Sequence, residues 1–388
     1  MTRNIDMGLA TRLTREGRLD EAMAVLRGAT APEVDGDPAG TAIEMSPPSA
    51  DNPAWRQASG HKPSSRTHSS PLLPKVGLAE LVRLHRRAGR AAVVTANDVP
   101  PGAAFATGRY SGPYGDRAYR LFAPSSHSGQ PAPLVVMLHG CTQSAGDFAA
   151  GTQMNALGER HGFFVLYPEQ SRLANGQGCW NWFDTRSGRA HAEAGWIMSA
   201  IEQICVLYAA DRRRVAVAGL SAGASMAALL ATRYAERIRA VVMHSGVPPG
   251  TANSVASAVG AMRGRHASPT PPSPASTSTD WPPLMVIHGD GDPIVSASNA
   301  DAAAQLWAGS GGAEEGATRT TRRGKRYPMQ VTDFKRGGKL IVTRVLVPQL
   351  GHAWSGGKAG KPFSDAQGPD ASRMAWAFAA KQFSDVPA

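Results

Sequence analysis

Cysteine is scarce in this sequence. The 388 residues contain three, Cys141, Cys179 and Cys205, and no two of them form a C-x-x-C pair. A zinc or redox site built from closely spaced cysteines is therefore not expected. Two states of the cysteines remain open. One is a single disulfide with a free thiol, for which Cys141 and Cys179 are the favoured pair, and the other is three unpaired core thiols.

Long apolar runs are also missing. No stretch approaches the roughly 18 consecutive apolar residues of a membrane-spanning helix. The first 13 residues carry charges throughout and lack the apolar segment of a cleavable secretory signal. Taken alone, these absences predict a soluble protein that stays in the cytoplasm and has no transmembrane segment.

Acidic residues are fewer than basic ones, 30 against 41, and the formal net charge is +11. Such an excess can attract a polyanion. However, arginine is scattered along the chain, its densest run (319–326) is expected in a loop, and no nucleic-acid-binding motif accompanies it. We therefore expect no nucleic-acid partner.

The first hundred residues differ from the rest of the chain. Residues 1–29 predict a helical segment, and residues 30–75, rich in Pro, Ser and Gly, predict a disordered linker. Residues 76–104 form a connector that begins with a basic amphipathic helix over 76–90. The basic face of that helix is either simply solvated or docks on an anionic surface, a polymer granule or a partner.

From about residue 105, short apolar runs alternate with helical stretches. This alternation is typical of an α/β fold with a mainly parallel central sheet and helices on both faces, so residues 105–388 are expected to form one such domain. The expected strands cover 117–122, 134–138, 163–167, 213–218, 240–244, 284–288 and 340–347. The expected helices cover 147–160, 192–208, 224–230, 298–308 and 370–383, and residues 262–283 are expected to be an exposed loop.

Ser221 stands in a G-x-S-x-G run over 219–223. An expected strand precedes this run and an expected helix follows it, which is the context of a nucleophile elbow. Glycine on either side of the turn lets the strand and the helix approach each other closely. Chance could supply these five residues in a chain this rich in Gly, Ser and Ala. Whether Ser221 is a nucleophile therefore depends on finding an acid and a base for it.

An elbow serine needs an acid and a histidine, which follow it in the order Ser, Asp, His. Asp292 ends a G-D-G-D turn after a buried strand, at the sheet edge where ligands gather; Asp290 is the alternative. His352 follows the last expected strand in a glycine-rich loop, whereas His288 is expected to make structural hydrogen bonds. We predict Ser221 as nucleophile, His352 as base and Asp292 as the group that orients the base.

The oxyanion hole of such a site needs two amides. One is the N–H of Ala222, directly after the nucleophile. The other comes from the loop over 138–143, where the Cys141 amide is the candidate and the His139 ring is expected to support the loop. Cys141 would thus act through its backbone, whatever the state of its thiol.

Tryptophans cluster near these residues in the sequence. Trp180 and Trp182 lie in a glycine-rich excursion over 175–188, and Trp354 lies two residues after His352. Aromatic side chains around an elbow can form an apolar wall for an acyl chain or a polymer. For each of these tryptophans, burial in the core is the alternative.

Five segments together resemble the polyhydroxybutyrate depolymerase esterase family of α/β-hydrolases. They occur in the family's order and cover 138–143, 179–183, 219–223, 288–292 and 351–357. The resemblance extends over about residues 105–383. It implies the α/β-hydrolase fold, hydrolysis of a carboxylic ester through an acyl-enzyme, and the triad and oxyanion amides named above, with no metal or cofactor.

The chain departs from the secreted members of that family in three ways. It shows no signal peptide and no recognisable C-terminal polymer-binding domain, and Ala224 stands where the family usually has a second glycine. A methyl group at that position is expected to be tolerated. Because of the resemblance, an extracellular location is the alternative to the cytoplasm.

The sequence therefore predicts a serine esterase. The preferred substrate is a short-chain poly(3-hydroxyalkanoate) polyester or its oligomers, and the alternative is a feruloyl or acetyl-xylan type ester. An alternative of another class is a non-catalytic protein that binds polyester granules or a partner.

Overall fold

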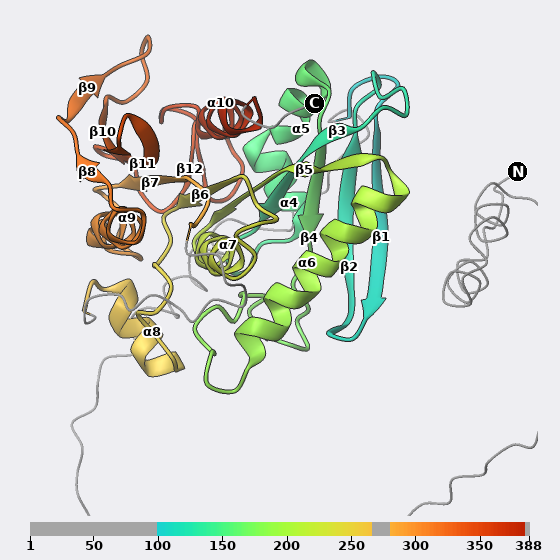
Figure 1. Ribbon diagram of the computed structural model, residues 1–388, viewed down its shortest axis with the longest axis horizontal. Coiled ribbons are helices and arrows are strands. Elements are labelled where there is room, and N and C mark those ends of the chain that lie inside the picture. The colour runs from blue at the N-terminus through green and yellow to red at the C-terminus, as the bar shows by residue number, and fades with distance from the viewer. Residues whose placement is uncertain (1–98, 266–279, 385–388) are drawn as a thin grey trace, which may run out of the picture. The chain divides into compact units, whose positions relative to one another are not determined.

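The computed structural model describes residues 99–265 and 280–384 (Figure 1). The predictions for residues 1–29 and 30–75, and for most of 76–104, lie outside the described residues. The same holds for the larger part of the loop expected over 262–283. None of the described helices is long and apolar enough to cross a membrane.

The main sheet has eleven strands in the order β1-β2-β4-β3-β5-β6-β7-β11-β10-β8, with β9 paired to β10. Its strands are β1 (Ala104–Gly112), β2 (Gly115–Ala123), β3 (Ala132–Leu138), β4 (Phe164–Pro168), β5 (Ala210–Leu220), β6 (Ala240–His244), β7 (Leu284–Gly289), β8 (Glu314–Glu315), β9 (Arg319–Thr321), β10 (Met329–Arg336) and β11 (Lys339–Val347). A separate pair is formed by β12 (Trp354–Ser355) and β13 (Ser364–Asp365).

The centre of the sheet is parallel and its edges are antiparallel. Strands β4, β3, β5, β6, β7 and β11 run parallel to one another. The hairpin of β1 and β2 adds antiparallel strands beside β4, and β10 with β8 and β9 adds them beside β11. The central strands are continuous apolar runs because both of their faces are covered.

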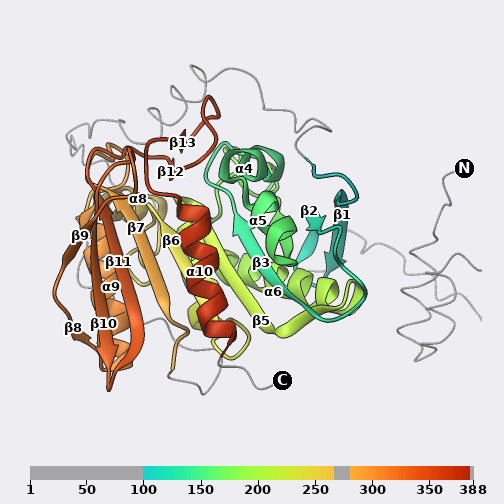
Figure 2. The same ribbon diagram turned by 90° about the horizontal axis from the view of Figure 1, so that it is seen from above.

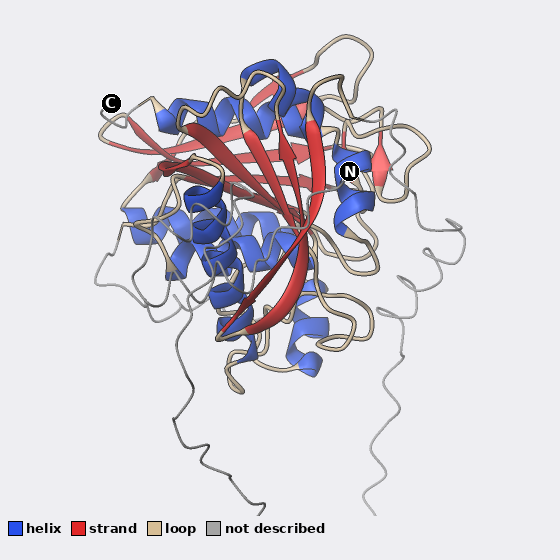
Figure 3. Cartoon of the chain, turned by 90° about the vertical axis from the view of Figure 1, so that its right-hand side faces the viewer, coloured by secondary structure: helices blue, strands red, loops and turns tan. Residues whose placement is uncertain are grey.

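Helices cover both faces of the sheet (Figures 2 and 3). They are α4 (Ala145–Thr152), α5 (Met154–His161), α6 (Arg189–Leu207), α7 (Ala222–Arg233), α8 (Val255–Met262), α9 (Ser298–Gly311) and α10 (Ala371–Phe383). One core cluster joins the sheet to α6, α7, α8 and α9, and the other joins it to α4, α5 and α10. The predicted α/β fold class, a mainly parallel sheet with helices on both faces, is confirmed.

Some elements differ from the prediction. The single helix expected over 147–160 is two helices, because Gln153 has a left-handed backbone (φ 56°) that ends α4 and precedes α5. The strands β1 and β10 and the helix α8 were not predicted. Strand β1 is half exposed and mixes polar with apolar residues, so it lacks the apolar run by which the buried strands were recognised.

The parallel strands end at one edge of the sheet, and that edge collects the predicted site. The loops after β3, β5, β7 and β11 carry Cys141, Ser221, Asp292 and His352. Strand order thus brings together residues that are far apart in the sequence, at the edge where open α/β sheets bind their ligands.

Candidate active site

Ser221 lies in a strained turn between β5 and α7, with φ 57° and ψ −122°. A left-handed conformation of this kind in a residue other than glycine costs on the order of 1–3 kcal/mol and is often found at functional sites. The Ser221 N–H donates to the carbonyl of His244 at 2.9 Å. A Cβ on Gly219 would overlap the Gly223 backbone, and a Cβ on Gly223 would overlap the Leu138 carbonyl, so both glycines are required by close packing.

Asp292 and His352 form a buried pair. The Nδ1–H of His352 donates to Asp292 Oδ2 at 2.7 Å, and the side chains are 4% and 0% exposed. The other carboxylate oxygen of Asp292 accepts the backbone N–H groups of Ile294 and Val295, each at 2.9 Å. This arrangement fixes the tautomer of His352 with its Nε2 unprotonated, as a general base requires.

A second imidazole also contacts Asp292. The Nε2 of His288 lies 3.4 Å from Asp292 Oδ2 and donates to the Val295 carbonyl at 3.0 Å. Burial by itself would raise the pKa of Asp292, but the hydrogen bonds and charges of His288 and His352 outweigh it and lower that pKa well below its usual range. Asp292 is thus held as a carboxylate, while Asp290 is exposed and accepts the N–H of Gln349.

Within the described residues, no hydrogen bond joins Ser221 Oγ to the ring of His352. The two residues are linked indirectly, because His244 contacts both the elbow and the loop that carries His352. Catalytic hydrogen bonds are often long without substrate, so this geometry remains compatible with proton transfer. His244 was not among the predicted site residues.

The amides of Cys141 and Ala222 have no hydrogen-bond acceptor among the described residues. The loop around Cys141 is held on both sides of it: Gly140 N–H donates to Gln143 Oε1, and Thr142 N–H donates to the Gln177 carbonyl. Two donors that are fixed and unpaired are what an oxyanion hole requires.

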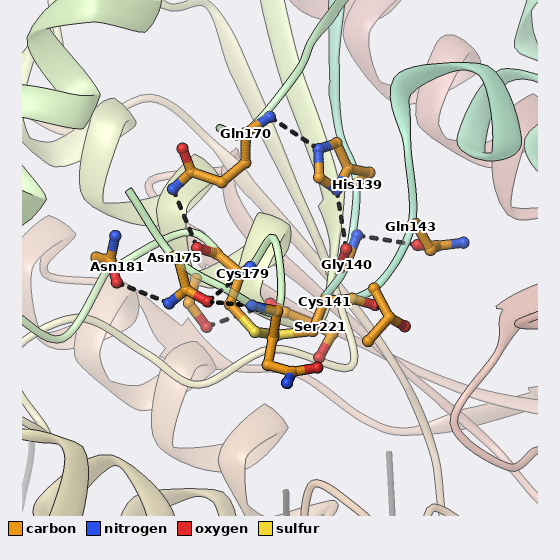
Figure 4. The surroundings of a disulfide bond; sticks show 12 residues. His139, Gly140, Cys141, Gln143, Gln170, Asn175, Cys179, Asn181 and Ser221 are labelled. Atoms are coloured by element: carbon orange, nitrogen blue, oxygen red, sulfur yellow. Dashed lines mark hydrogen bonds between the residues drawn. A yellow bond between two sulfur atoms is a disulfide. The ribbon is translucent and has the colours of Figure 1, made fainter. Parts of the chain in front are cut away.

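His139 supports the same loop through both ring nitrogens (Figure 4). Its Nδ1–H donates to the Gly140 carbonyl at 2.8 Å, and its Nε2 accepts the Gln170 N–H at 3.1 Å. Burial lowers the pKa of His139, which keeps the ring neutral and preserves the acceptor. These are the structural contacts that the sequence led us to expect.

A disulfide joins Cys141 to Cys179, with 4.2 Å between their Cα atoms, and it lies beside Ser221 (Figure 4). It connects the loop of the candidate oxyanion amide to the tryptophan-rich excursion. Cys205 is free and buried in α6, and burial raises the pKa of its thiol to about 11. The favoured pairing is therefore confirmed, and the alternative of three unpaired thiols is wrong.

A buried carboxylate that we did not predict anchors the excursion. Glu193 on α6 accepts the backbone and side-chain N–H groups of Asn181 at 2.7 and 2.6 Å, and the side chain of Gln170 at 2.8 Å. Arg117 lies 3.6 Å away and balances its charge. The available signal was an acidic residue that stands between two alanines in the first half of a helix.

An apolar cavity of about 190 Å³ opens beside Ser221. Trp180 and Trp182 line it, together with residues of α8 such as Val259 and Met262. Both tryptophans are also buried in the core, so their contact with substrate stays a prediction. Trp354 lies elsewhere: it is 1% exposed, packs edge-on against Phe148 and face-on against His244, and donates to Ser372 Oγ. The structure therefore places Trp354 in the core rather than on the cavity wall.

A metal centre is not found in the described part of the chain. No group of three or more His, Cys, Asp or Glu side chains there could hold a metal ion. Of the three buried histidines near the sheet edge, His288 and His352 instead contact the Asp292 carboxylate, and His244 accepts a backbone N–H.

Curated relatives of the chain are ester hydrolases by name. It is 33% identical over 190 residues to poly(3-hydroxyalkanoate) depolymerase C of Paucimonas lemoignei, covering 44% of each chain. It is 27% identical over 217 residues to a probable acetylxylan esterase A of Aspergillus fumigatus, covering 51% of this chain and 56% of that protein. The chain thus spans about half the length of these relatives.

A solved structure shares the fold. The acetyl xylan esterase from Aspergillus awamori superposes with a TM-score of 0.52 at 20% identity, covering 64% of this chain and 94% of that one. The model of the family described as "Esterase PHB depolymerase" matches residues 117–326, more than half of the chain. The chain therefore belongs to the esterase PHB depolymerase family, as its motifs predicted.

Proposed function

We propose that this protein is a serine carboxylic ester hydrolase that acts through an acyl-enzyme. The observation that carries the proposal is the convergence at one sheet edge of three features. These are a strained elbow serine, a buried Asp292–His352 pair and two amides without an acceptor, all next to an apolar cavity. The names of the relatives support the same reaction class.

In the proposed reaction, Ser221 Oγ bonds to the ester carbonyl carbon while His352 Nε2 takes the hydroxyl proton. The carbonyl electron pair moves to oxygen, where the Cys141 and Ala222 amides stabilise it. The intermediate then expels the alcohol, which receives the proton from His352. Water repeats the sequence on the acyl-enzyme and releases the acid, while Asp292 stabilises the imidazolium in both halves.

The first experiment measures hydrolysis of p-nitrophenyl butyrate by wild type and Ser221→Ala. We expect activity that falls at least a thousandfold in the variant, because the nucleophile is lost. A folded wild type without activity on any ester would contradict the proposal and favour the non-catalytic granule-binding or partner-binding alternative.

We propose a short-chain poly(3-hydroxyalkanoate) polyester or its oligomers as the preferred substrate. The cavity of about 190 Å³ exceeds the ~150 Å³ that suffices for a benzene molecule, so an acetyl group would leave most of it empty. The polar side chains of Asn175 and Ser225 on its wall already have partners within the chain. A wall with few free polar groups suits an aliphatic ester better than a phenolic one.

The alternative substrate is a feruloyl or acetyl-xylan type ester, which the acetylxylan relatives and a feruloyl esterase B of Neurospora crassa (31% identical over 140 residues) favour. Clearing of amorphous polyester is to be compared with release of ferulate and acetate from plant polysaccharide. Faster release of ferulate or acetate would overturn the polyester proposal while leaving ester hydrolysis intact.

A size test addresses the cavity itself. Val259→Phe adds bulk on the wall formed by α8 and is expected to shift the preference from p-nitrophenyl butyrate towards the acetate. Ala256→Phe, on the exposed side of the same helix, is the matched control. An unchanged preference in Val259→Phe would show that the acyl group lies elsewhere.

The compartment and the surface partners also remain proposals. Disulfides persist mainly in oxidising compartments, so the Cys141–Cys179 bond favours the extracellular alternative over the cytoplasm. Contact with a granule or another anionic surface through residues 76–90 concerns a segment outside the described residues. Fractionation of cells and medium tests the location directly.

A further inference from the structure

His244 is a buried histidine that transfers no proton in the proposed reaction. It ends β6, next to β5, and its side chain has no exposed surface. A fully buried histidine normally has its polar atoms satisfied for a structural or functional reason. Its contacts reach two parts of the candidate site.

The backbone of His244 holds the nucleophile. Its carbonyl accepts the N–H of Ser221 at 2.9 Å, which fixes the first residue of the strained elbow. The next residue, Ser245, also has a left-handed backbone (φ 53°), and its N–H donates to the Ile287 carbonyl on β7. A strained residue therefore follows each of the neighbouring strands β5 and β6. The N–H of each donates to a carbonyl of the next strand in the sheet.

The side chain of His244 holds the loop of the base. Its Nε2 accepts the N–H of Ser355 at 3.1 Å, three residues after His352 and 111 residues away from His244 in the sequence. Its ring stacks on Trp354 with 5.1 Å between the centroids. Ser355 is itself fixed from the other side, because its hydroxyl donates to the Pro369 carbonyl at 2.6 Å.

The hydrogen bonds define the tautomer of His244. Because Nε2 accepts from Ser355, the proton is on Nδ1, which donates to Ser245 Oγ at 3.1 Å. Burial, followed by the charges of His288 and His352, lowers the pKa of His244 to about 3 against the opposing effect of Asp292. The ring is therefore neutral at any pH at which an esterase of this kind would be assayed, and the acceptor for Ser355 is always present.

We propose that His244 is a positioning residue that sets the distance between Ser221 and His352 by holding the elbow with its carbonyl and the base loop with its ring. The inference rests on the proposed function, and it concerns placement rather than chemistry. Misplacement of reacting groups by ~1 Å can cost on the order of a hundredfold in rate.

Three substitutions separate the hydrogen bond from the packing. Gln places an amide near the position of Nε2, so His244→Gln can still accept from Ser355. Asn reaches only the position of Nδ1, so His244→Asn can keep the bond to Ser245 but loses Ser355. Phe keeps the ring and its stacking on Trp354 and loses both bonds. His127→Phe is the control, because His127 also contacts an aromatic ring but precedes β3 at the opposite edge of the sheet.

We expect kcat on p-nitrophenyl butyrate to fall ten- to a hundredfold in His244→Phe and His244→Asn, with KM within threefold of wild type. His244→Gln is expected to retain most of kcat, and His127→Phe all of it. Urea unfolding of each protein gives its folded fraction. The rate at which a fluorophosphonate labels Ser221 gives a second reading that needs no ester turnover.

The outcomes are distinguishable. Wild-type kcat in His244→Phe, or equal losses in Gln and Asn, would overturn the proposal, as would losses that match the unfolded fraction of each variant. If wild type hydrolysed no ester, the proposed function would fail. Labelling of Ser221 would then still decide whether His244 places the nucleophile and the base.

Discussion

At the scale of single residues, the candidate site depends on how Asp292 is surrounded. Its side chain is fully buried, yet both oxygens are satisfied, by two backbone amides on one side and by two imidazoles on the other. A carboxylate without these donors would take up a proton on burial. Asp292 is therefore suited to orient His352 without being protonated itself.

Asp292→Asn is expected to lower kcat by a factor of ~10³–10⁴, because the amide can impose the wrong tautomer on the base. Asp290→Asn, two residues earlier and exposed, is the matched control and is expected to stay within twofold of wild type. Measurement of kcat on p-nitrophenyl butyrate decides between them. The reverse result would identify Asp290 as the acid.

The lowered pKa of Asp292 also predicts how stability depends on pH. A carboxyl with a lower pKa in the folded than in the unfolded state stabilises the fold above the unfolded value of ~4, and this contribution is lost as the pH falls below it. We therefore expect the free energy of unfolding to fall more steeply between pH 5 and pH 2 in wild type than in Asp292→Asn. Urea unfolding across this range measures it, and parallel curves would contradict the lowered pKa.

At the scale of elements, the site is made by contacts between loops and helices that are separate in the sequence. The disulfide ties the loop after β3 to the excursion before α6, and Glu193 on α6 holds Asn181 of that excursion by two hydrogen bonds. On the other side of Ser221, α7 packs against the segment that follows β6. The proposed oxyanion amide of Cys141 and the cavity wall therefore depend on the same few contacts.

Loss of the disulfide is expected to cost ~2–4 kcal/mol of stability, since it closes a loop of 38 residues, and to lower kcat as the Cys141 amide loses its fixed place. Cys141→Ala and Cys179→Ala should have equal effects, and the double variant should add nothing because both remove one bond. Cys205→Ala, a free thiol in α6, is the control for kcat. Thermal unfolding and kcat are measured for each variant with and without a thiol reductant. Losses in the double variant equal to the sum of the two single losses would contradict the prediction.

Ala224, where the family usually has glycine, has room for its methyl because the facing residue is Gly246. A Cβ on Gly246 would lie 2.6 Å from the Ala224 Cβ. Gly246→Ala is therefore expected to destabilise the protein by ~1–3 kcal/mol through overpacking. Adding Ala224→Gly should recover part of that loss. Denaturant unfolding of the single and double variants measures the coupling, and purely additive losses would argue against direct contact.

At the scale of the described part of the molecule, the parallel strands bring the site together. Every predicted site residue lies between residues 141 and 354, on loops or elements at one edge of the sheet or in the core beneath it. The family match begins at residue 117. The chemistry is therefore expected to need little from residues 1–98.

Deletion of residues 1–98 is expected to leave kcat/KM on p-nitrophenyl butyrate within twofold. If residues 76–90 dock on an anionic polymer surface, the same deletion should weaken binding to that surface, most strongly at low salt. Assays of the soluble ester and of polymer-film binding separate the two effects. Loss of soluble-ester activity in a folded protein would mean that the deleted residues contribute to the site.

The sequence by itself determined the fold class, the strands whose following loops carry the site, and the family. These depend on local patterns: apolar runs with the length of strands, a strand–turn–helix around Ser221, and glycine-rich turns before Asp292 and His352. The tertiary structure decided which cysteines pair and that Trp354 lies in the core. It also decided that α8 lines the cavity and that His244 contacts both the elbow and the loop of His352. Those contacts join residues up to 111 positions apart, and they follow from strand order and packing, which no local pattern encodes.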